Sequence, residues 1–184
     1  MDSNGNANIY VALLRGINVG GHKKVPMAEL RLLLTELGHG SARTLLASGN
    51  AVFTAPAADP GELTAALEKA IAERFGFPVD CLVLTRDELR ATAARCPFPA
   101  DTIDPARLLV LFLDRPPADT PFAALDPVAL APDEFRLGER EIFAHFPDGM
   151  GRSKLGDALA AAPRGCKATG RNWRTVTKLL ELAG

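Results

Sequence analysis

Two apolar runs constrain this chain more than any other feature of its sequence. Residues Ile9–Leu14 and Leu108–Leu113 are apolar at almost every position, so neither run alternates apolar and polar residues. A strand that is apolar on both sides belongs in the middle of a sheet whose two faces are both covered. The pattern therefore predicts two buried central strands, one in each half of the chain.

The signals around the first run predict the order β-α-β-β-α-β, followed by a helix. The elements are expected at Ile9–Leu14, Pro26–Leu37, Arg43–Ala47, Ala51–Thr54, Asp59–Phe75, Val79–Leu84 and Thr85–Arg95. Two helix starts are well marked, because Asp59 precedes a proline and Thr85 is followed by Glu88 in a capping-box pattern. This order is the split β-α-β, ferredoxin-like arrangement.

The second half repeats this order with weaker signals. The elements are expected at Leu108–Leu113, Pro121–Leu125, Glu134–Leu137, Glu141–Phe146, Ser153–Ala161, Gly165–Ala168 (a poor strand) and Arg171–Leu182. We therefore expect an α+β fold of two ferredoxin-like halves, each followed by a helix and related by a degenerate duplication. The halves cover residues 1–99 and 100–184, with a linker at Ala100–Ala106.

The composition is typical of a globular cytoplasmic protein. Hydrophobic residues make up 47% of the chain and charged residues 23%, which is ordinary for such proteins. Three cysteines form no C-x-x-C pair, which disfavours a disulfide framework and a zinc site. No apolar run approaches the roughly 20 residues that span a bilayer. We expect a cytoplasmic protein without a metal, a cofactor or a membrane partner.

The charge is distributed unevenly along the chain. Residues 1–148 carry 14 Lys/Arg and 20 Asp/Glu, whereas residues 149–184 carry 7 and 2. Such asymmetry indicates an acidic partner for the C-terminal segment. The alternative is a basic helix face that only contacts solvent.

The stretch Leu13–Met27 is the strongest candidate for a binding site. It holds three glycines, one asparagine and three fixed cations, with no acidic residue. A strand, a glycine-rich loop and a helix can turn backbone N–H groups toward an anion. The spacing is not that of a nucleotide P-loop, because His22 occupies the lysine position. The alternative is that the glycines only permit a tight turn. The candidate ligand-binding residues here are Arg15, Gly16, Asn18, Gly20, Gly21, Lys23 and Lys24.

Further candidates lie outside this stretch. Ser48 and Asn50 follow a predicted strand and lie in a turn, where turn chemistry alone is the alternative. Lys154 belongs to a basic patch, with a solvated first-turn charge as the alternative. Arg171 and Asn172 precede or open the last helix, whose N-terminus attracts anions.

Three blocks of this sequence resemble an uncharacterised bacterial family, domain-of-unknown-function family 1697. The blocks are Tyr10–Gly21 with Lys24–Met27, Ala47–Phe53, and Thr169 with Arg171–Trp173, Thr175–Val176 and Lys178–Leu179. The resemblance implies two ferredoxin-like halves, which agrees with the order of elements above. It implies no activity.

The sequence favours a protein that binds a phosphate-bearing ligand, either a nucleotide or a nucleic acid. This hypothesis expects the glycine-rich stretch and the C-terminal basic segment to form one positively charged site. A second hypothesis is an enzyme acting on a small anionic or phosphorylated substrate, positioned by Arg15, Asn50 and Arg171. A third is an interaction module without a ligand. The sequence identifies no catalytic residue.

Overall fold

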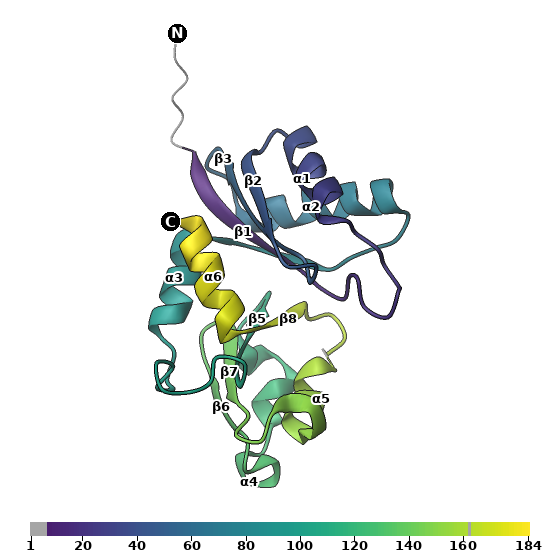
Figure 1. Ribbon diagram of the computed structural model, residues 1–184. Coiled ribbons are helices and arrows are strands. Elements are labelled where there is room, and N and C mark those ends of the chain that lie inside the picture. The colour runs from purple at the N-terminus through teal and green to yellow at the C-terminus, as the bar shows by residue number, and fades with distance from the viewer. Residues whose placement is uncertain (1–6, 162) are drawn as a thin grey trace. The chain divides into compact units, whose positions relative to one another are not determined.

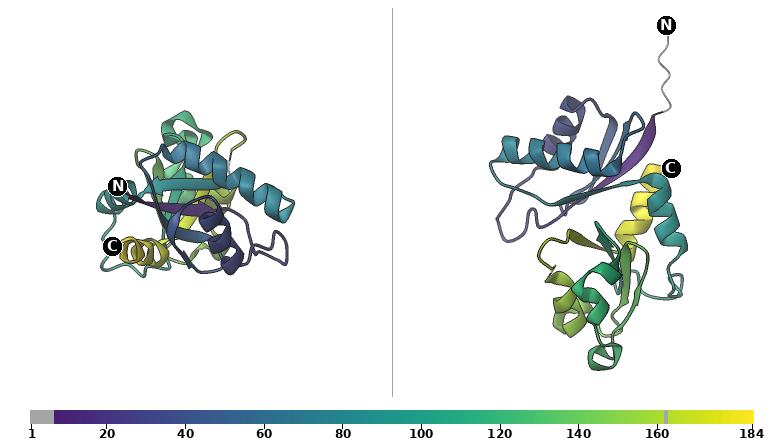
Figure 2. Two further views of the ribbon diagram at one scale, coloured as in Figure 1. Left: turned by 90° about the horizontal axis from the view of Figure 1, so that it is seen from above. Right: turned by 180° about the vertical axis from the view of Figure 1, so that it is seen from behind.

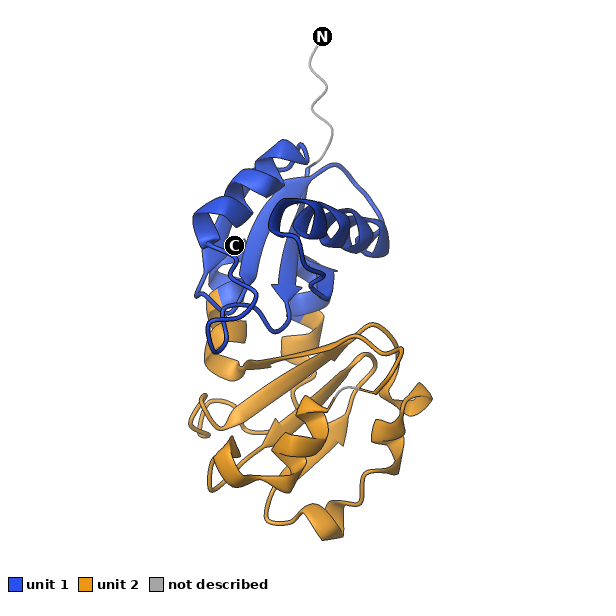
Figure 3. Ribbon diagram, turned by 90° about the vertical axis from the view of Figure 1, so that its right-hand side faces the viewer, with its two compact units in different colours: residues 1–90, 179–184 blue, residues 91–178 orange. Residues whose placement is uncertain are grey.

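The computed structural model describes residues 7–161 and 163–184 and has a mixed α/β fold (Figure 1). Its described residues contain two four-stranded antiparallel sheets and six α-helices. The chain divides into two compact units, Met1–Arg90 with Leu179–Gly184, and Ala91–Lys178 (Figure 3). These compact units are not the two repeated halves predicted from the sequence. The boundary between those halves, at residues 99 and 100, stays a prediction.

The first unit is built on a sheet with the strand order β2-β3-β1-β4. Its strands are β1 (Asn8–Leu14), β2 (Gly40–Leu45), β3 (Asn50–Ala55) and β4 (Cys81–Thr85). Helices α1 (Met27–Glu36) and α2 (Pro60–Phe75) pack on one face of the sheet (Figure 2). Strand β1 is central, as its apolar sequence predicts.

Both faces of β1 are buried, which explains why the strand shows no alternation. Tyr10, Ala12 and Leu14 belong to the core beneath α1 and α2. Val11 and Leu13 point to the opposite face and are also fully buried. Each helix contributes a stripe to the core, consisting of Leu30, Leu33 and Leu34 from α1 and Leu63, Leu67 and Ile71 from α2.

Helix α2 also closes the exposed edge of β4. The backbone N–H of Cys81 donates to Glu68 Oε1 at 2.9 Å. The N–H of Val83 donates to Thr64 Oγ1 at 3.1 Å. An edge strand normally presents such groups to other chains, and here two helix side chains satisfy them.

The second unit has a sheet with the order β6-β7-β5-β8. Its strands are β5 (Leu108–Leu113), β6 (Glu134–Leu137), β7 (Glu141–His145) and β8 (Ala168–Asn172). Its shorter helices are η1 (Pro117–Asp119), η2 (Pro121–Ala124), α4 (Pro127–Leu130), η3 (Met150–Arg152) and α5 (Lys154–Ala160). Strand β5 is central and buried, again as its sequence predicts.

Helices α3 (Arg86–Ala94) and α6 (Trp173–Ala183) follow β4 and β8 without an intervening loop. Thr85 Oγ1 accepts from the Glu88 N–H at 3.1 Å, and Glu88 Oε2 accepts from the Thr85 N–H at 2.7 Å, so the predicted capping box is present. Asn172 Oδ1 accepts from the Thr175 N–H at 2.9 Å and caps α6 in a similar way.

Several expected element boundaries are wrong. The last strand covers Ala168–Asn172 rather than Gly165–Ala168, and α6 begins at Trp173 rather than Arg171. The reason is tertiary pairing, because the polar segment lies against β5, with Arg171 opposite Val110. Strand β2 likewise ends at Leu45, so Ala47 lies in the following turn.

None of the helices in the described residues is sufficiently long and apolar to span a membrane.

Replacement of Thr64 by valine should destabilise the first unit. The change preserves shape but leaves the buried N–H of Val83 without its acceptor, which costs about 1–3 kcal/mol. Thr35→Val is the matched control, because both hydroxyls donate to a carbonyl four residues earlier but only Thr64 also accepts from β4. Urea unfolding should show a larger loss for Thr64→Val. Equal losses would contradict the assigned role of this edge contact.

Candidate functional site

The glycine-rich stretch forms a short β-hairpin, which we call the hairpin arm and define as residues 15–26. Val19 and His22 pair across it, with the His22 N–H donating to the Val19 carbonyl at 3.0 Å. Gly20 and Gly21 lie between them with φ of 58° and 78°. Positive φ at both central residues is what a type I′ hairpin turn requires. The arm leaves the end of β1 and leads to α1 (Figures 1 and 2).

The base of the arm is held by the side chain of Asn18. Its Nδ2 donates to the carbonyls of Val25 at 2.9 Å and Ala47 at 2.7 Å, and its Oδ1 accepts from the Val25 N–H at 2.9 Å. The Asn18 N–H also donates to the Lys23 carbonyl at 3.1 Å. Ile17 and Val25 are buried at the same place. The arm is therefore anchored at its base although its tip is exposed.

The cations of the arm differ in their surroundings. Lys23 has a φ of 46°, and its Nζ donates to the Pro78 carbonyl at 2.8 Å. His22 and Lys24 are exposed. Arg15 is half-buried, and its N–H donates to the Asp80 carbonyl at 2.9 Å. The geometry explains Gly20 and Gly21 as turn residues. The three consecutive basic residues His22–Lys24 are all exposed.

Ser48 and Asn50 lie beside the base of the arm in the first unit. Asn50 is the first residue of β3 and is fully buried, and its Nδ2 donates to the Leu45 carbonyl at 2.8 Å and to Ser48 Oγ at 3.1 Å. Leu46 and Gly49 in this turn both have positive φ, of 60° and 90°. The structure thus brings Asn18, Ser48 and Asn50 to one end of one sheet, through the contact of Asn18 with Ala47.

Arg171 lies in the second unit, in a different setting from the one expected. Its side chain belongs to a strand rather than to a helix N-terminus and is buried. The guanidinium Nη1 donates to Thr169 Oγ1 and to the Gly170 carbonyl, each at 2.8 Å. Burial lowers the pKa of Arg171 to about 10, so the group is still charged at neutral pH. The convergence of Arg171 with the arm stays a prediction.

Lys154 is the exposed first residue of α5 in the second unit. The preceding Ser153 donates to Asp133 Oδ2 at 2.5 Å and accepts from the Gly156 N–H at 2.8 Å. A pocket of about 610 Å³ lies beside this contact. It is lined by Pro132, Asp133, Asp148, Gly149, Gly151, Arg152 and Ser153. Sequence reasoning missed Asp133, because no spacing relates it to Ser153.

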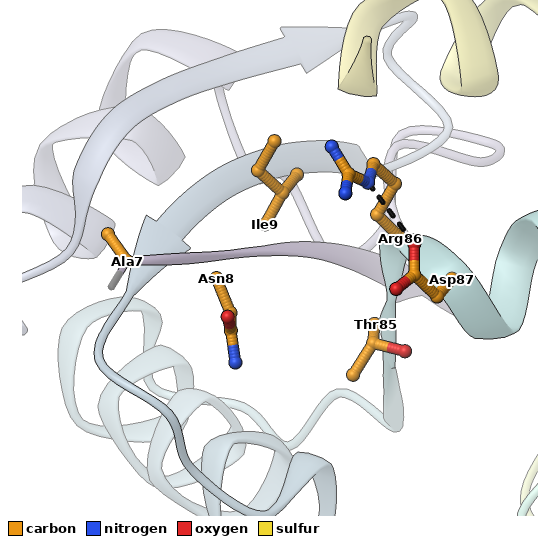
Figure 4. Close-up of a pocket in the computed structure, with 6 residues that line it drawn as sticks. All are labelled: Ala7, Asn8, Ile9, Thr85, Arg86 and Asp87. Carbon is orange, nitrogen blue, oxygen red and sulfur yellow. Dashed lines mark hydrogen bonds and ion pairs between the residues drawn. The ribbon is translucent and has the colours of Figure 1, made fainter. Parts of the chain in front are cut away.

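A second pocket, of about 270 Å³, lies in the first unit where β1 begins and β4 ends (Figure 4). It is lined by Ala7, Asn8, Ile9, Thr85, Arg86 and Asp87. Arg86 Nε forms an ion pair with Asp87 Oδ1 at 3.3 Å. The charges of these two lining residues therefore offset each other. No sequence pattern pointed to it.

Metal-ligating side chains do not gather among the residues that the structure describes. No three histidine, cysteine, aspartate or glutamate side chains of that part of the chain are grouped so that they could hold a metal ion.

Comparison with known proteins gives a family and a similar structure. A family described as "Protein of unknown function (DUF1697)" matches residues 8–143. The fold is similar to a solved structure described as that of conserved bacterial protein SP0830 from Streptococcus pneumoniae. The TM-score is 0.80 and the identity 28%, over 97% of this chain and 99% of that one. No curated protein matches.

The Asn18 contacts predict how two substitutions should differ. Asn18→Ala removes three side-chain hydrogen bonds at the base of the arm, with an expected cost of about 1–3 kcal/mol. Asn18→Gly removes the same bonds but fits the φ of 56° without strain, so it should recover about 1 kcal/mol. Chemical denaturation of both variants measures the difference. A glycine variant no more stable than the alanine variant would show that the backbone is not strained there.

Proposed function

We propose that the hairpin arm binds a phosphate-bearing ligand, in a chain that belongs to the DUF1697 family of proteins of unknown function. The observation that carries the proposal is the exposed His22–Lys24 segment, on an arm that contains no acidic residue between positions 15 and 26. Lysine and arginine are the side chains that recognise phosphate.

The charges of the two lysines support this assignment. No ion pair described for residues 7–161 and 163–184 includes Lys23 or Lys24. The partner of Lys23 is the carbonyl of Pro78, which holds the ammonium group in place without neutralising its charge. An incoming phosphate therefore meets two lysines that form no ion pair with an acidic side chain of the described residues.

The rigidity of the arm also supports binding. Its type I′ turn and the Asn18 contacts fix the backbone before any ligand arrives. A group that is already ordered loses less conformational freedom on binding, so more of its interaction energy is realised as affinity.

We also propose that both halves of the chain belong to the ferredoxin-like class and that they arose by one duplication. The matching strand orders support it. In the first sheet Leu13 pairs with Asn50 and Leu14 with Cys81, and the second sheet repeats these pairs as Phe112 with Glu141 and Leu113 with Ala168.

The ends of the two final strands support the same duplication. Thr85 ends β4 and caps α3, and Asn172 ends β8 and caps α6. In this equivalence Cys81 corresponds to Ala168 and Thr85 to Asn172.

The alternatives of an enzyme and of a module without a ligand stay predictions. We also retain a cytoplasmic setting as part of the proposal, which three cysteines that form no disulfide in the described residues support.

Replacement of Lys24 by alanine should weaken binding of phosphate-bearing probes. An exposed contact between opposite charges contributes about 0.2–1 kcal/mol, so the dissociation constant should rise up to about fivefold. Titrations at low salt with ATP and with labelled single-stranded and duplex oligonucleotides provide the measurement. Lys69→Ala is the matched control, because it removes one exposed lysine of the same unit, on α2. Equal effects of the two changes, or no binding of any probe, would contradict the proposal.

A further inference from the structure

The pocket beside Ser153 in the second unit is lined by charges that form no ion pairs. It lies between the segment that follows α4 and the segment that precedes α5, and its volume of about 610 Å³ is in the range of pockets that hold small organic molecules. Two carboxylates, Asp133 and Asp148, and the guanidinium of Arg152 line it. None of these three side chains forms an ion pair within the part of the chain that the structure describes.

Asp133 is the most informative of these residues, because it is buried and yet retains an unbonded acceptor. The residue is only 9% exposed. Its Oδ2 accepts from the Ser153 hydroxyl at 2.5 Å, whereas its Oδ1 accepts no hydrogen bond from the described residues. No side-chain oxygen or nitrogen atom of those residues is both buried and without a hydrogen bond. Oδ1 is therefore accessible, and the space that it reaches is the pocket that Asp133 lines.

Ser153 holds this carboxylate in one orientation. Its side chain is buried, and its hydroxyl donates to Asp133 and accepts from the Gly156 N–H at 2.8 Å. Both hydrogen bonds of the hydroxyl are made inside the protein, so Ser153 positions Asp133 rather than contacting a ligand. A carboxylate that is already fixed loses little conformational freedom when a ligand binds to it.

We infer that this pocket binds a small organic molecule through a primary ammonium group, an inference that goes beyond the phosphate-binding function of the arm and does not depend on it. An ammonium group presents three N–H donors at one point, and a single acceptor oxygen from each carboxylate suits it. Asp133 offers one unbonded oxygen, whereas the planar fork of a guanidinium pairs best with two. Asp148 lines the same pocket and supplies a further acceptor.

Other classes of ligand match the charges of the pocket less well. A neutral molecule would cover the two carboxylates without supplying an opposite charge, which costs free energy. A phosphate would meet two acidic side chains of its own sign. A metal ion such as Ca²⁺ takes six to eight oxygen ligands, and the described residues contain no group of three acidic, histidine or cysteine side chains that could hold one. Arg152 would also repel a metal ion.

The test is an NMR titration of the isotopically labelled full chain with n-butylamine and with n-butyltrimethylammonium. The amine should shift the amide signals of residues 133 and 148–153. The trimethylated probe has the same charge but no N–H donor, so it should bind at least about tenfold more weakly. Asp133→Asn should weaken binding of n-butylamine by a similar factor, because it preserves shape but removes the charged acceptor. Asp126→Asn is the matched control, since Asp126 also accepts a hydrogen bond in the second unit but does not line the pocket.

Two further probes distinguish the possible sources of the ammonium group. 4-Aminobutanoate and 1,4-diaminobutane have the same chain length and differ in one terminal group. Tighter binding of 4-aminobutanoate, lost in Arg152→Gln, would assign the site to a zwitterion of the amino-acid type, with Arg152 contacting its carboxylate. Tighter binding of 1,4-diaminobutane would assign the site to a polyamine. Arg164→Gln is the control for the arginine change, because Arg164 is exposed in the same unit but does not line the pocket.

Three outcomes would overturn the inference. The first is that no amine shifts the amides of residues 133 and 148–153. The second is an affinity for n-butylamine that is unchanged in Asp133→Asn or equalled by the trimethylated probe. The third is a saturable and tighter response of the same amides to calcium chloride, which would assign the carboxylates to a metal ion. Circular dichroism verifies that each variant is folded.

Discussion

The side-chain amide of Asn18 is the interaction on which the proposed site depends. It bonds to both backbone groups of Val25, which closes the base of the arm, and to the carbonyl of Ala47, which ties the arm to the neighbouring turn. Asparagine suits the position for a second reason, because it tolerates the positive φ that the backbone adopts there. Without these contacts the glycines at the tip would leave a mobile loop, and the two lysines would have no fixed positions.

The place of the arm follows from the constraint that β1 must be central. At the end of β1, the Leu14 N–H donates to the Gly49 carbonyl and the Arg15 N–H to the Asp80 carbonyl. The arm therefore emerges between the starts of β3 and β4, where Ala47 and Pro78 can accept from its side chains. In the second unit the residue after β5 is Asp114, whose N–H donates to the Lys167 carbonyl. The residue after the central strand is thus a cation in the first unit, whereas in the second it is an aspartate that pairs with Arg115 at 3.1 Å, so we place the proposed phosphate site in the first unit.

The sequence predicted most elements and missed features that depend on contacts between distant segments. Apolar runs and capping residues located β1, β5 and the starts of α2 and α3, because these signals are local. Strand β8 was misplaced, because its polar Thr-Gly-Arg segment is held by pairing with β5. The amide of Asn50 was considered for ligand binding, yet it is buried and bonds to its own turn. The hairpin pairing of Val19 with His22 was also missed, because two residues on each side are too few for a strand pattern.

The most direct test of the account is amide chemical-shift mapping of the isotopically labelled full chain during titration with ATP and, separately, with a short DNA duplex at low salt. The account predicts that the shifts concentrate in residues 15–26 and in the adjoining turn at residues 46–49, and that they diminish as salt is added. Shifts confined to other surfaces, such as the pocket of the second unit beside Ser153, would contradict it, as would a spectrum that both probes leave unchanged.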